Sequence, residues 1–305
     1  MKLIYIMGVA RSGSTLLNSI LGCHPDIMAV GELENLPTQG WIENGLCSCG
    51  EKVDECEFWA GVKKSWKSVD NADVNISDYI QQQRKYTRLK SILFLFRKNI
   101  SLSDQNFRNF LETSKRLFES ILTCSGKTVL VDSSKNPARA LALSFIPGID
   151  FYLIHLVRDA RGVIWSHKKA FQKDTSAGVQ HEIKPRNALC TAIDWLIVNV
   201  VSELVFRYIN KKCLFVRYED FVNNPADGIE KIGMFADIDT SVLAPSLKKE
   251  LVLDTEHIVA GNRLRMNRKI IIKPDTEWQR SLSFTDKTIF WLFDAILSVK
   301  YGYIK

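Results

Sequence analysis

The sequence predicts an α/β protein built on a parallel β-sheet with helices on its faces, and two observations carry this prediction. Short apolar runs, typical of strands that are buried on both faces, recur along the chain. They alternate with longer segments whose apolar residues follow the helical period, which is the pattern of consecutive βαβ units. We therefore expect a single domain over residues 1–305.

The expected strands are short, and the expected helices lie between them. Strands are expected at residues 3–7, 128–131, 151–157 and 213–216. Helices are expected at residues 15–21, 104–122, 186–209 and 225–235. Right-handed crossovers between parallel strands leave the ligand site at the carboxyl ends of the strands. Functional residues are therefore expected directly after the strands.

Composition fits a folded, soluble chain. Hydrophobic residues make up 46% and charged residues 25% of the sequence, which excludes disordered, collagen-like and membrane-dominated proteins. The 41 basic and 34 acidic side chains give a net charge of +7, an excess that fits a polyanion or one small, highly charged anion equally well.

The location predicted from the sequence is the cytoplasm. The apolar run at the N-terminus is too short for an export signal and lacks a small-residue cleavage site. The longest apolar stretch, residues 195–206, is interrupted by Asn199 and Glu203 and falls short of the roughly 18 to 20 residues that a membrane span needs. Without export, the seven cysteines are expected to be reduced thiols.

An insertion of about 85 residues is expected after the first βα unit, over residues 40–125 approximately. Residues 40–75 are irregular and rich in Gly, Cys, Trp and charge, whereas residues 79–121 have a helical pattern with a basic face. We interpret this insertion as the region that determines acceptor specificity. A second irregular stretch, residues 254–279, carries several basic side chains.

The first strand leads through a glycine-containing turn directly into a helix, which is typical of a phosphate-binding loop. Its backbone N–H groups and hydroxyls can donate to an anion. The spacing nearly matches the P-loop pattern, but Ser14 stands where that pattern has lysine, which disfavours a magnesium-dependent triphosphate site. We therefore expect a P-loop-like fold without a metal. The loop residues are Arg11, Ser12, Gly13, Ser14 and Thr15.

A second anion site is expected after the strand at residues 151–157. Arg158 follows this strand, and Ser166 lies one or two helical turns further on. A guanidinium and a hydroxyl on one face fit a phosphate monoester. The alternative is a surface ion pair between Arg158 and Asp159.

With these two loops in place, the chain resembles the sulfotransferases that use 3′-phosphoadenosine 5′-phosphosulfate, in particular the branch of bacterial, carbohydrate and tyrosylprotein enzymes. The matching residues extend from 3 to 303 and so cover the whole chain. In order, they include residues 11–17, 24–25 with 31–33, 132–137, 156–162 with Ser166, 217–220 with 224–225, 261–263 and 301–303.

The resemblance implies a role for several positions. Residues 11–15 would hold the 5′-phosphosulfate, and Arg158 with Ser166 would hold the 3′-phosphate. Asn262 and Arg263 would add nucleotide contacts. Tyr218, after the last expected strand, is either a further nucleotide contact or a core aromatic residue.

Sulfuryl transfer needs a base for the acceptor proton and cations for the charge on the leaving phosphate. Glu32 is the candidate base because it places a carboxylate above the first loop, and related enzymes use a glutamate in this Gly-Glu motif. The spacing from His24 leaves Glu34 as the alternative. Lys135 is the candidate cation, expected in a loop over residues 132–135 at the end of a strand, and Arg11 could share its role.

Three cysteines, Cys47, Cys49 and Cys56, offer thiolates, but the only fourth ligand nearby in the sequence is Cys23 or His24. Structural zinc sites use four closed ligands, commonly with Cys-x-x-Cys spacing, so no metal is expected. A disulfide from Cys47 or Cys49 to Cys56 could form on oxidation. The loop is instead expected to pack on three aromatic residues, Trp41, Phe58 and Trp59.

The predicted activity is transfer of a sulfuryl group from 3′-phosphoadenosine 5′-phosphosulfate to a hydroxyl or amine of a small molecule, such as a specialised metabolite. A P-loop kinase or other phosphotransferase is the alternative. Residues 84–98 could form a basic helical face that binds nucleic acid, but their mixed apolar residues favour an amphipathic helix packed on the core. No nucleic-acid or membrane partner is expected.

Overall fold

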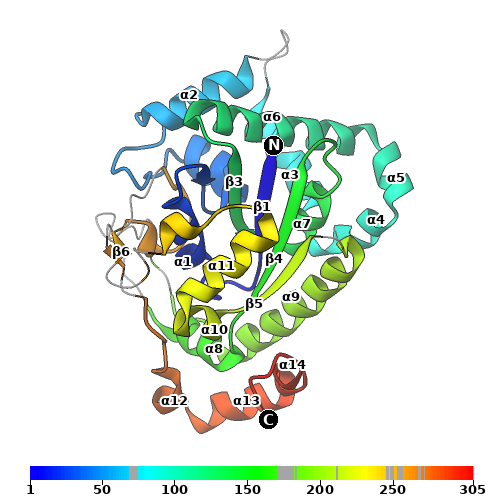
Figure 1. The fold of residues 1–305 in the computed structure, drawn as a ribbon. Helices are drawn as coiled ribbons and strands as arrows, with labels where there is room; N and C mark the ends of the chain where they lie inside the picture. Colours follow the sequence, from blue (N-terminus) through cyan, green and yellow to red (C-terminus); the bar gives the residue numbers. More distant parts are fainter. Residues whose placement is uncertain are drawn as a thin grey trace.

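The fold is described from a computed structural model of the chain (Figure 1). The residues that it describes are 1–68, 74–170, 182, 184–210, 212–244, 247, 251–252, 257–266, 269–270 and 272–304. Within them, a five-stranded parallel sheet with the order β2-β3-β1-β4-β5 forms the centre. Its strands are β1 (Lys2–Gly8), β2 (Ile27–Ala29), β3 (Val129–Lys135), β4 (Asp150–Val157) and β5 (Cys213–Arg217). The predicted fold class is confirmed.

Helices cover both faces of the sheet, as the apolar strands require. Alternate residues of β1 point to opposite faces, so Ile4 and Ile6 pack on one side while Leu3 and Tyr5 pack on the other. The first face is covered by α1 (Ser14–Gly22), α10 (Tyr218–Asn223) and α11 (Pro225–Ala236). The opposite face is covered by α6 (Gln105–Ser125), α7 (Pro137–Leu143) and part of α9 (Ala188–Ile209).

The remaining elements lie around this core. A third apolar cluster joins α9 to α8 (Ala160–Lys168), α12 (Trp278–Ser281), α13 (Phe284–Phe293) and α14 (Ala295–Lys300). A two-stranded antiparallel sheet pairs β6 (Leu251–Val252) with β7 (Lys269–Ile270). Short 3₁₀ turns occupy Leu33–Asn35, Leu89–Ser91, Ser241–Leu243 and Arg263–Met266, and a π-helical turn occupies Leu36–Ile42.

The insertion is more helical than the sequence analysis expected. It contains α2 (Glu57–Lys67), α3 (Ile76–Tyr86), α4 (Ile92–Phe96) and α5 (Lys98–Ser103) before α6, and α2 lies alongside α6 (Figure 1). Helix α2 falls in the stretch that was expected to be irregular. Its buried residues follow a helical spacing that bridges the intervening glycine: Trp59, Val62 and Trp66.

One further expectation about this region was wrong in detail. Residues 84–98 do not form one amphipathic helix, because the chain breaks after α3 and again between α4 and α5. Ile92 and Leu95 of α4 are buried, so this segment packs on the core. The strand β2 was not expected at all, since three residues are too few to give a pattern.

Helix α9 is longer than the apolar stretch on which the membrane expectation rested. Among the described helices it is the one whose length and mean hydropathy, 1.7, would allow it to cross a membrane. A third of its apolar window is buried, and its buried face, which includes Trp195 and Asn199, packs against the rest of the domain. Core helices of soluble proteins have the same composition, so α9 is weak evidence for a membrane span.

Candidate active site

The carboxyl ends of the central strands bring most of the candidate residues to one edge of the sheet. Strand β1 lies between β3 and β4, so the loop after β1 has the ends of both neighbours beside it. Met7 is in register with Lys135 of β3, and Gly8 is in register with Leu156 of β4. The two anion loops predicted from the sequence are therefore neighbours.

The loop after β1 turns sharply into α1. Arg11 and Gly13 have φ values of 70° and 93°, in the left-handed region, and α1 begins at Ser14 without a side-chain N-cap. The Ser12 hydroxyl is buried and has no hydrogen-bond partner among the residues that the structure describes. A buried, unpartnered donor next to a helix N-terminus fits an oxyanion of the phosphate or sulfate type.

Arg158 lies against this loop from the neighbouring strand. Its guanidinium donates to the Arg11 carbonyl at 2.9 Å, and its carbon lies 4.8 Å from the centre of the Tyr218 ring. Only 7% of its side chain is exposed. Its ionic partner is Asp275, at 2.8 Å, rather than the Asp159 of the surface-pair alternative. Sequence reasoning missed Asp275 because it lies far along the chain in a stretch that drew attention only for its basic residues.

Asp159 interacts with α8 and not with Arg158. It caps the N-terminus of α8 by accepting from the Arg161 N–H at 2.9 Å and forms an ion pair with the Arg161 side chain at 2.7 Å. Ser166, in the last turns of α8, is half-buried. Its neighbour His167 hydrogen-bonds the backbone of Ala10, so this end of α8 lies against the first loop.

Burial, with the nearby charges of Arg11 and Arg186, lowers the pKa of His167 to about 4. The imidazole is therefore neutral at pH 7, but it is a weak proton acceptor. This makes His167 a poor substitute for a carboxylate base.

Glu32 and Lys135 form an ion pair at the end of β3. Both are largely buried, with 20% and 15% of their side chains exposed, and Asn35 donates to the other Glu32 oxygen at 3.0 Å. Strand β3 runs through to Lys135, so the expected loop over residues 132–135 is in fact strand. Lys135 has a φ of 71° and ends it, which keeps the predicted strand-end position.

A segment from the C-terminal third of the chain joins Glu32 to the first loop. A Cβ atom on Gly261 would lie 3.5 Å from the Thr15 hydroxyl oxygen and 3.6 Å from Oε1 of Glu32. The Asn262 N–H donates to the Thr15 hydroxyl at 3.3 Å. Glu32 and Thr15 therefore face the same narrow space. The side chain of Arg263 lies outside the part of the chain that the structure describes.

Glu34, the alternative base, points into a buried network. It accepts from Thr87 at 2.9 Å and from Asn136 at 3.0 Å, and its own carbonyl accepts from Gln83 at 2.8 Å. Burial raises the pKa of Glu34. The same network includes the fully buried ion pair Asp132–Arg139. Glu34 thus ties the insertion to the sheet and does not face the first loop.

Tyr218 begins α10 and packs on the first loop. A Cβ atom on Gly13 would lie 2.3 Å from a Tyr218 ring carbon, so the glycine permits this contact. Burial raises the pKa of Tyr218. The ring therefore serves as a wall between the loop and Arg158, a position from which it could also contact a nucleotide.

Together, a parallel α/β sheet, a phosphate-type loop after β1 and a cation after β4 define a P-loop-like protein with a candidate anion site at the ends of its central strands. The profile of the Sulfotransferase family matches residues 4–241, so the chain belongs to the sulfotransferase family. No curated protein matches the chain.

Solved structures with similar folds include two sulfotransferase domains. The domain of the Synechococcus PCC 7002 olefin synthase is 18% identical, with a TM-score of 0.48, and the match covers 96% of this chain and 94% of that one. The domain of the curacin biosynthetic pathway is 15% identical, with a TM-score of 0.49, over 95% and 96%. A sulfotransferase from Mycobacterium avium is 13% identical, with a TM-score of 0.42, over 79% and 64%. Family membership follows from the match over residues 4–241, not from these distant likenesses.

Proposed function

We propose that this protein transfers a sulfuryl group from 3′-phosphoadenosine 5′-phosphosulfate to a hydroxyl or amine of a small molecule. The observation that carries the proposal is the Glu32–Lys135 pair, which shares the space beside Thr15 with the first loop. A carboxylate and an ammonium at an oxyanion loop are the groups that sulfuryl transfer needs.

Two separate anion-binding positions support a donor with phosphates at both its 5′ and 3′ positions. Residues 11–15 would hold the 5′-phosphosulfate, which would supply a partner for the buried Ser12 hydroxyl. Arg158, in contact with the same loop and with Tyr218, would hold the 3′-phosphate together with Ser166. When bound, the donor supplies a sulfuryl group joined to a phosphate leaving group.

The protein's own residues divide the work of the transfer. Glu32 takes the proton from the acceptor hydroxyl or amine as the new bond to sulfur forms. Lys135 and Arg11 hold the negative charge that develops on the departing phosphate. A sulfuryl group carries less charge than a phosphoryl group, so the proposed reaction uses side chains where a kinase uses magnesium.

The insertion is the proposed acceptor-binding region. Gln83 of α3 and Thr87 reach Glu34, two residues beyond the proposed base, so the insertion borders the site. A small, soluble acceptor and a cytoplasmic location remain predictions, as does the lack of nucleic-acid and membrane partners.

Nucleotide binding tests the donor assignment. Adenosine 3′,5′-bisphosphate should raise the melting temperature without magnesium, because a ligand that binds only the folded state stabilises it. Adenosine 5′-monophosphate, which lacks the 3′-phosphate, should give a smaller shift at the same concentration. A preference for ATP that depends on magnesium would overturn the donor assignment in favour of a phosphotransferase.

Acceptor identity needs a transfer assay. The protein is incubated with 3′-phosphoadenosine 5′-phosphosulfate and a metabolite extract, and new sulfated products are followed by mass spectrometry. Products that gain a sulfuryl group only with active protein support the proposal. The Glu32→Gln variant is the matched control, since it should bind the donor without forming product.

A further inference from the structure

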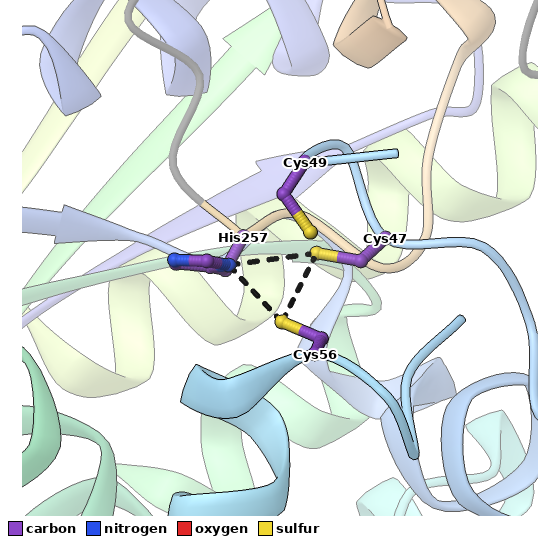
Figure 2. A group of neighbouring side chains, drawn as sticks. All are labelled: Cys47, Cys49, Cys56 and His257. Carbon is purple, nitrogen blue, oxygen red and sulfur yellow. Dashed lines mark hydrogen bonds between the residues drawn. The ribbon is translucent and has the colours of Figure 1, made fainter. Parts of the chain in front are cut away.

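Three cysteines and one histidine from opposite ends of the chain converge beside the candidate active site. Cys47, Cys49 and Cys56 come from the segment before α2, and His257 comes from the segment after β6 (Figure 2). One ligand atom from each residue lies within 4.8 Å of every other. His257 lies 201 residues from Cys56 in the sequence, so the neighbours of the cysteines in the chain did not reveal this fourth ligand. Cys23 instead hydrogen-bonds the Ser19 carbonyl, and His24 hydrogen-bonds the Asp239 carbonyl.

The spacing of three of these atoms fits the edges of a tetrahedron around a zinc ion, and the fourth, Sγ of Cys49, lies within 4.8 Å of each of them. Zn–S and Zn–N bonds of about 2.3 Å and 2.0–2.1 Å imply tetrahedral edges of about 3.8 Å between sulfur atoms and about 3.5 Å between sulfur and nitrogen. The Sγ atoms of Cys47 and Cys56 are 3.9 Å apart. Nδ1 of His257 lies 3.8 Å from the first and 3.2 Å from the second.

The imidazole is held in this orientation by its surroundings. The His257 ring stacks on Phe58, with centroids 4.7 Å apart and planes at 15°, and the Trp59 indole donates to the His257 carbonyl at 2.8 Å. Both aromatic residues belong to α2, which begins directly after Cys56. The helix that follows one ligand thus positions another, so Nδ1 faces the sulfur atoms.

The local charge supplies a second, independent observation. Arg265 is only 2% exposed, and its guanidinium donates to the carbonyls of Val259 and Leu46. Its Nη1 atom has no hydrogen-bond partner among the described residues. A buried cation needs a compensating anion. Cys47 directly follows Leu46, whose carbonyl accepts from this guanidinium, so a thiolate at Cys47 would supply such an anion.

We propose that Cys47, Cys49, Cys56 and His257 bind one zinc ion in a closed structural site. Three thiols and a neutral imidazole take up Zn²⁺ and release three protons, which leaves a complex with a net charge of −1 beside Arg265. Thiolate and imidazole ligands in a tetrahedron favour zinc over magnesium, calcium and manganese, which prefer oxygen ligands. Four protein ligands leave no open position, so the metal supports the structure and takes no part in the reaction.

The zinc site would hold the segment with Gly261 and Asn262 in place against the candidate active site. Next to the ligands, Ser48 and Ile258 exchange two hydrogen bonds, of 2.9 Å from the Ser48 N–H and 2.8 Å to the Ser48 hydroxyl. Two residues further on, the Ala260 carbonyl accepts from the Glu32 N–H at 3.3 Å. Zinc would therefore fix the position of Glu32 through this segment.

Metal content of the full-length protein tests the proposal. The protein is purified under reducing conditions without added metal or chelator, and its zinc content is measured by inductively coupled plasma mass spectrometry. About one zinc per chain is expected, and Cys49→Ser, Cys56→Ser and His257→Gln should each lower this content. Cys190→Ser is the matched control, since this exposed cysteine of α9 lies outside the cluster.

Cobalt(II) gives a second readout that needs no variant. Replacement of zinc by cobalt in the wild-type protein should give the visible and near-ultraviolet absorption of a tetrahedral, thiolate-ligated ion, which identifies the ligand set. A folded protein that lacks zinc and gives no such spectrum after reconstitution would overturn the proposal. So would a disulfide between Cys47 and Cys56 in the protein as purified.

Neither measurement uses the donor or the acceptor, so the zinc site can fail while the proposed function stands, and the reverse. The contribution of the metal to stability is tested separately. A chelator should lower the melting temperature of the wild-type protein and of Cys190→Ser, and leave that of Cys56→Ser unchanged. An equal fall in all three proteins would contradict a role for this site in stability.

Discussion

The two acidic residues of the Gly-Glu-Leu-Glu stretch have opposite environments although they are two positions apart. Glu32 pairs with Lys135 at the edge of the sheet, whereas Glu34 is enclosed by Thr87 and Asn136. The chain can separate them because residues 33–35 form a 3₁₀ turn that points successive side chains in different directions. The two residues are of the same type, so the candidate base is distinguished by the surroundings of its carboxylate.

Exchange of each glutamate for glutamine separates the two roles. We expect Glu32→Gln to bind donor normally and to lose turnover by about 10²-fold or more, the usual effect of a lost general base. Glu34→Gln should keep its turnover per folded molecule and lose about 1–3 kcal/mol of stability, because one buried acceptor becomes a donor. Turnover with a chosen acceptor and urea unfolding measure the two effects. Normal turnover in Glu32→Gln, with loss in Glu34→Gln, would show that the base was misassigned.

Arg158 is the second residue whose surroundings allow a sharp test. In Arg158→Ala, binding of adenosine 3′,5′-bisphosphate should weaken by about 1.5–3 kcal/mol, the range for a charged hydrogen bond. Binding of adenosine 5′-phosphosulfate, without the 3′-phosphate, should change little. Isothermal titration measures both, and equal losses would place Arg158 away from the 3′-phosphate.

The ion pair with Asp275 predicts an effect in the opposite direction. A 3′-phosphate must compete with this carboxylate, which lies 2.8 Å from the guanidinium. Asp275→Asn should tighten bisphosphate binding by about fivefold, the equivalent of a competing ion pair worth about 1 kcal/mol. Weaker binding in this variant would mean that Asp275 orients Arg158 rather than competing for it.

At the scale of elements, the loop between β1 and α1 depends on a single close contact. Gly13 has a φ of 93° and lies so near Tyr218 that a methyl group would meet the ring at 2.3 Å. Gly126, which follows α6, also has a positive φ, 67°, but has nothing within 4 Å of its missing Cβ atom. The two glycines share a positive φ, which glycine adopts without strain, and differ in packing.

Alanine at each glycine therefore separates strain from steric conflict. Gly126→Ala should lose about 1–2 kcal/mol of stability, the cost of a left-handed alanine, and bind adenosine 3′,5′-bisphosphate normally. Gly13→Ala should lose more stability and bind the nucleotide poorly, since either the loop or Tyr218 must move. Urea unfolding and nucleotide titration of both variants check this. Equal behaviour of the two variants would argue against a tight loop–ring contact.

At the scale of the whole molecule, stability is expected to depend on pH through a histidine in the core. His155 lies on β4, 2% exposed, against Phe215 and Tyr301, and hydrogen-bonds Asn199 at 3.1 Å. Burial lowers its pKa to about 4. In the unfolded chain the histidine pKa is about 6.5, so between about pH 6.5 and 4 this residue is protonated in the unfolded state and neutral in the folded state.

The free energy of unfolding should therefore fall as the pH drops from about 6.5 to about 4, by up to about 1.4 kcal/mol per pH unit from this residue. The lowered pKa of His167 acts in the same direction. Urea unfolding across this window measures the slope. His155→Gln removes the titrating ring, so its slope should be shallower than that of the wild-type protein; an identical slope would mean that His155 is not the source.

The sequence by itself determined the elements whose patterns are local. Continuous apolar runs predicted β1, β3, β4 and β5, and helical periods predicted α1, α6, α9 and α11, each to within a few residues of its observed bounds. The two anion loops were found the same way, because each directly follows such a strand. Local chemistry was enough there, since a strand end and a helix start are adjacent in the chain.

Only the tertiary structure decided what meets at the site. Asp275 reaches Arg158, Gly261 fits between Glu32 and Thr15, and His257 completes the cysteine cluster, although each lies more than a hundred residues from its partner. The strand order that puts β1 between β3 and β4, and the burial that sets Glu34 apart from Glu32, arise in the same way. Packing between distant segments leaves no periodic trace in the sequence, because a contact of this kind constrains single residues rather than a repeating pattern.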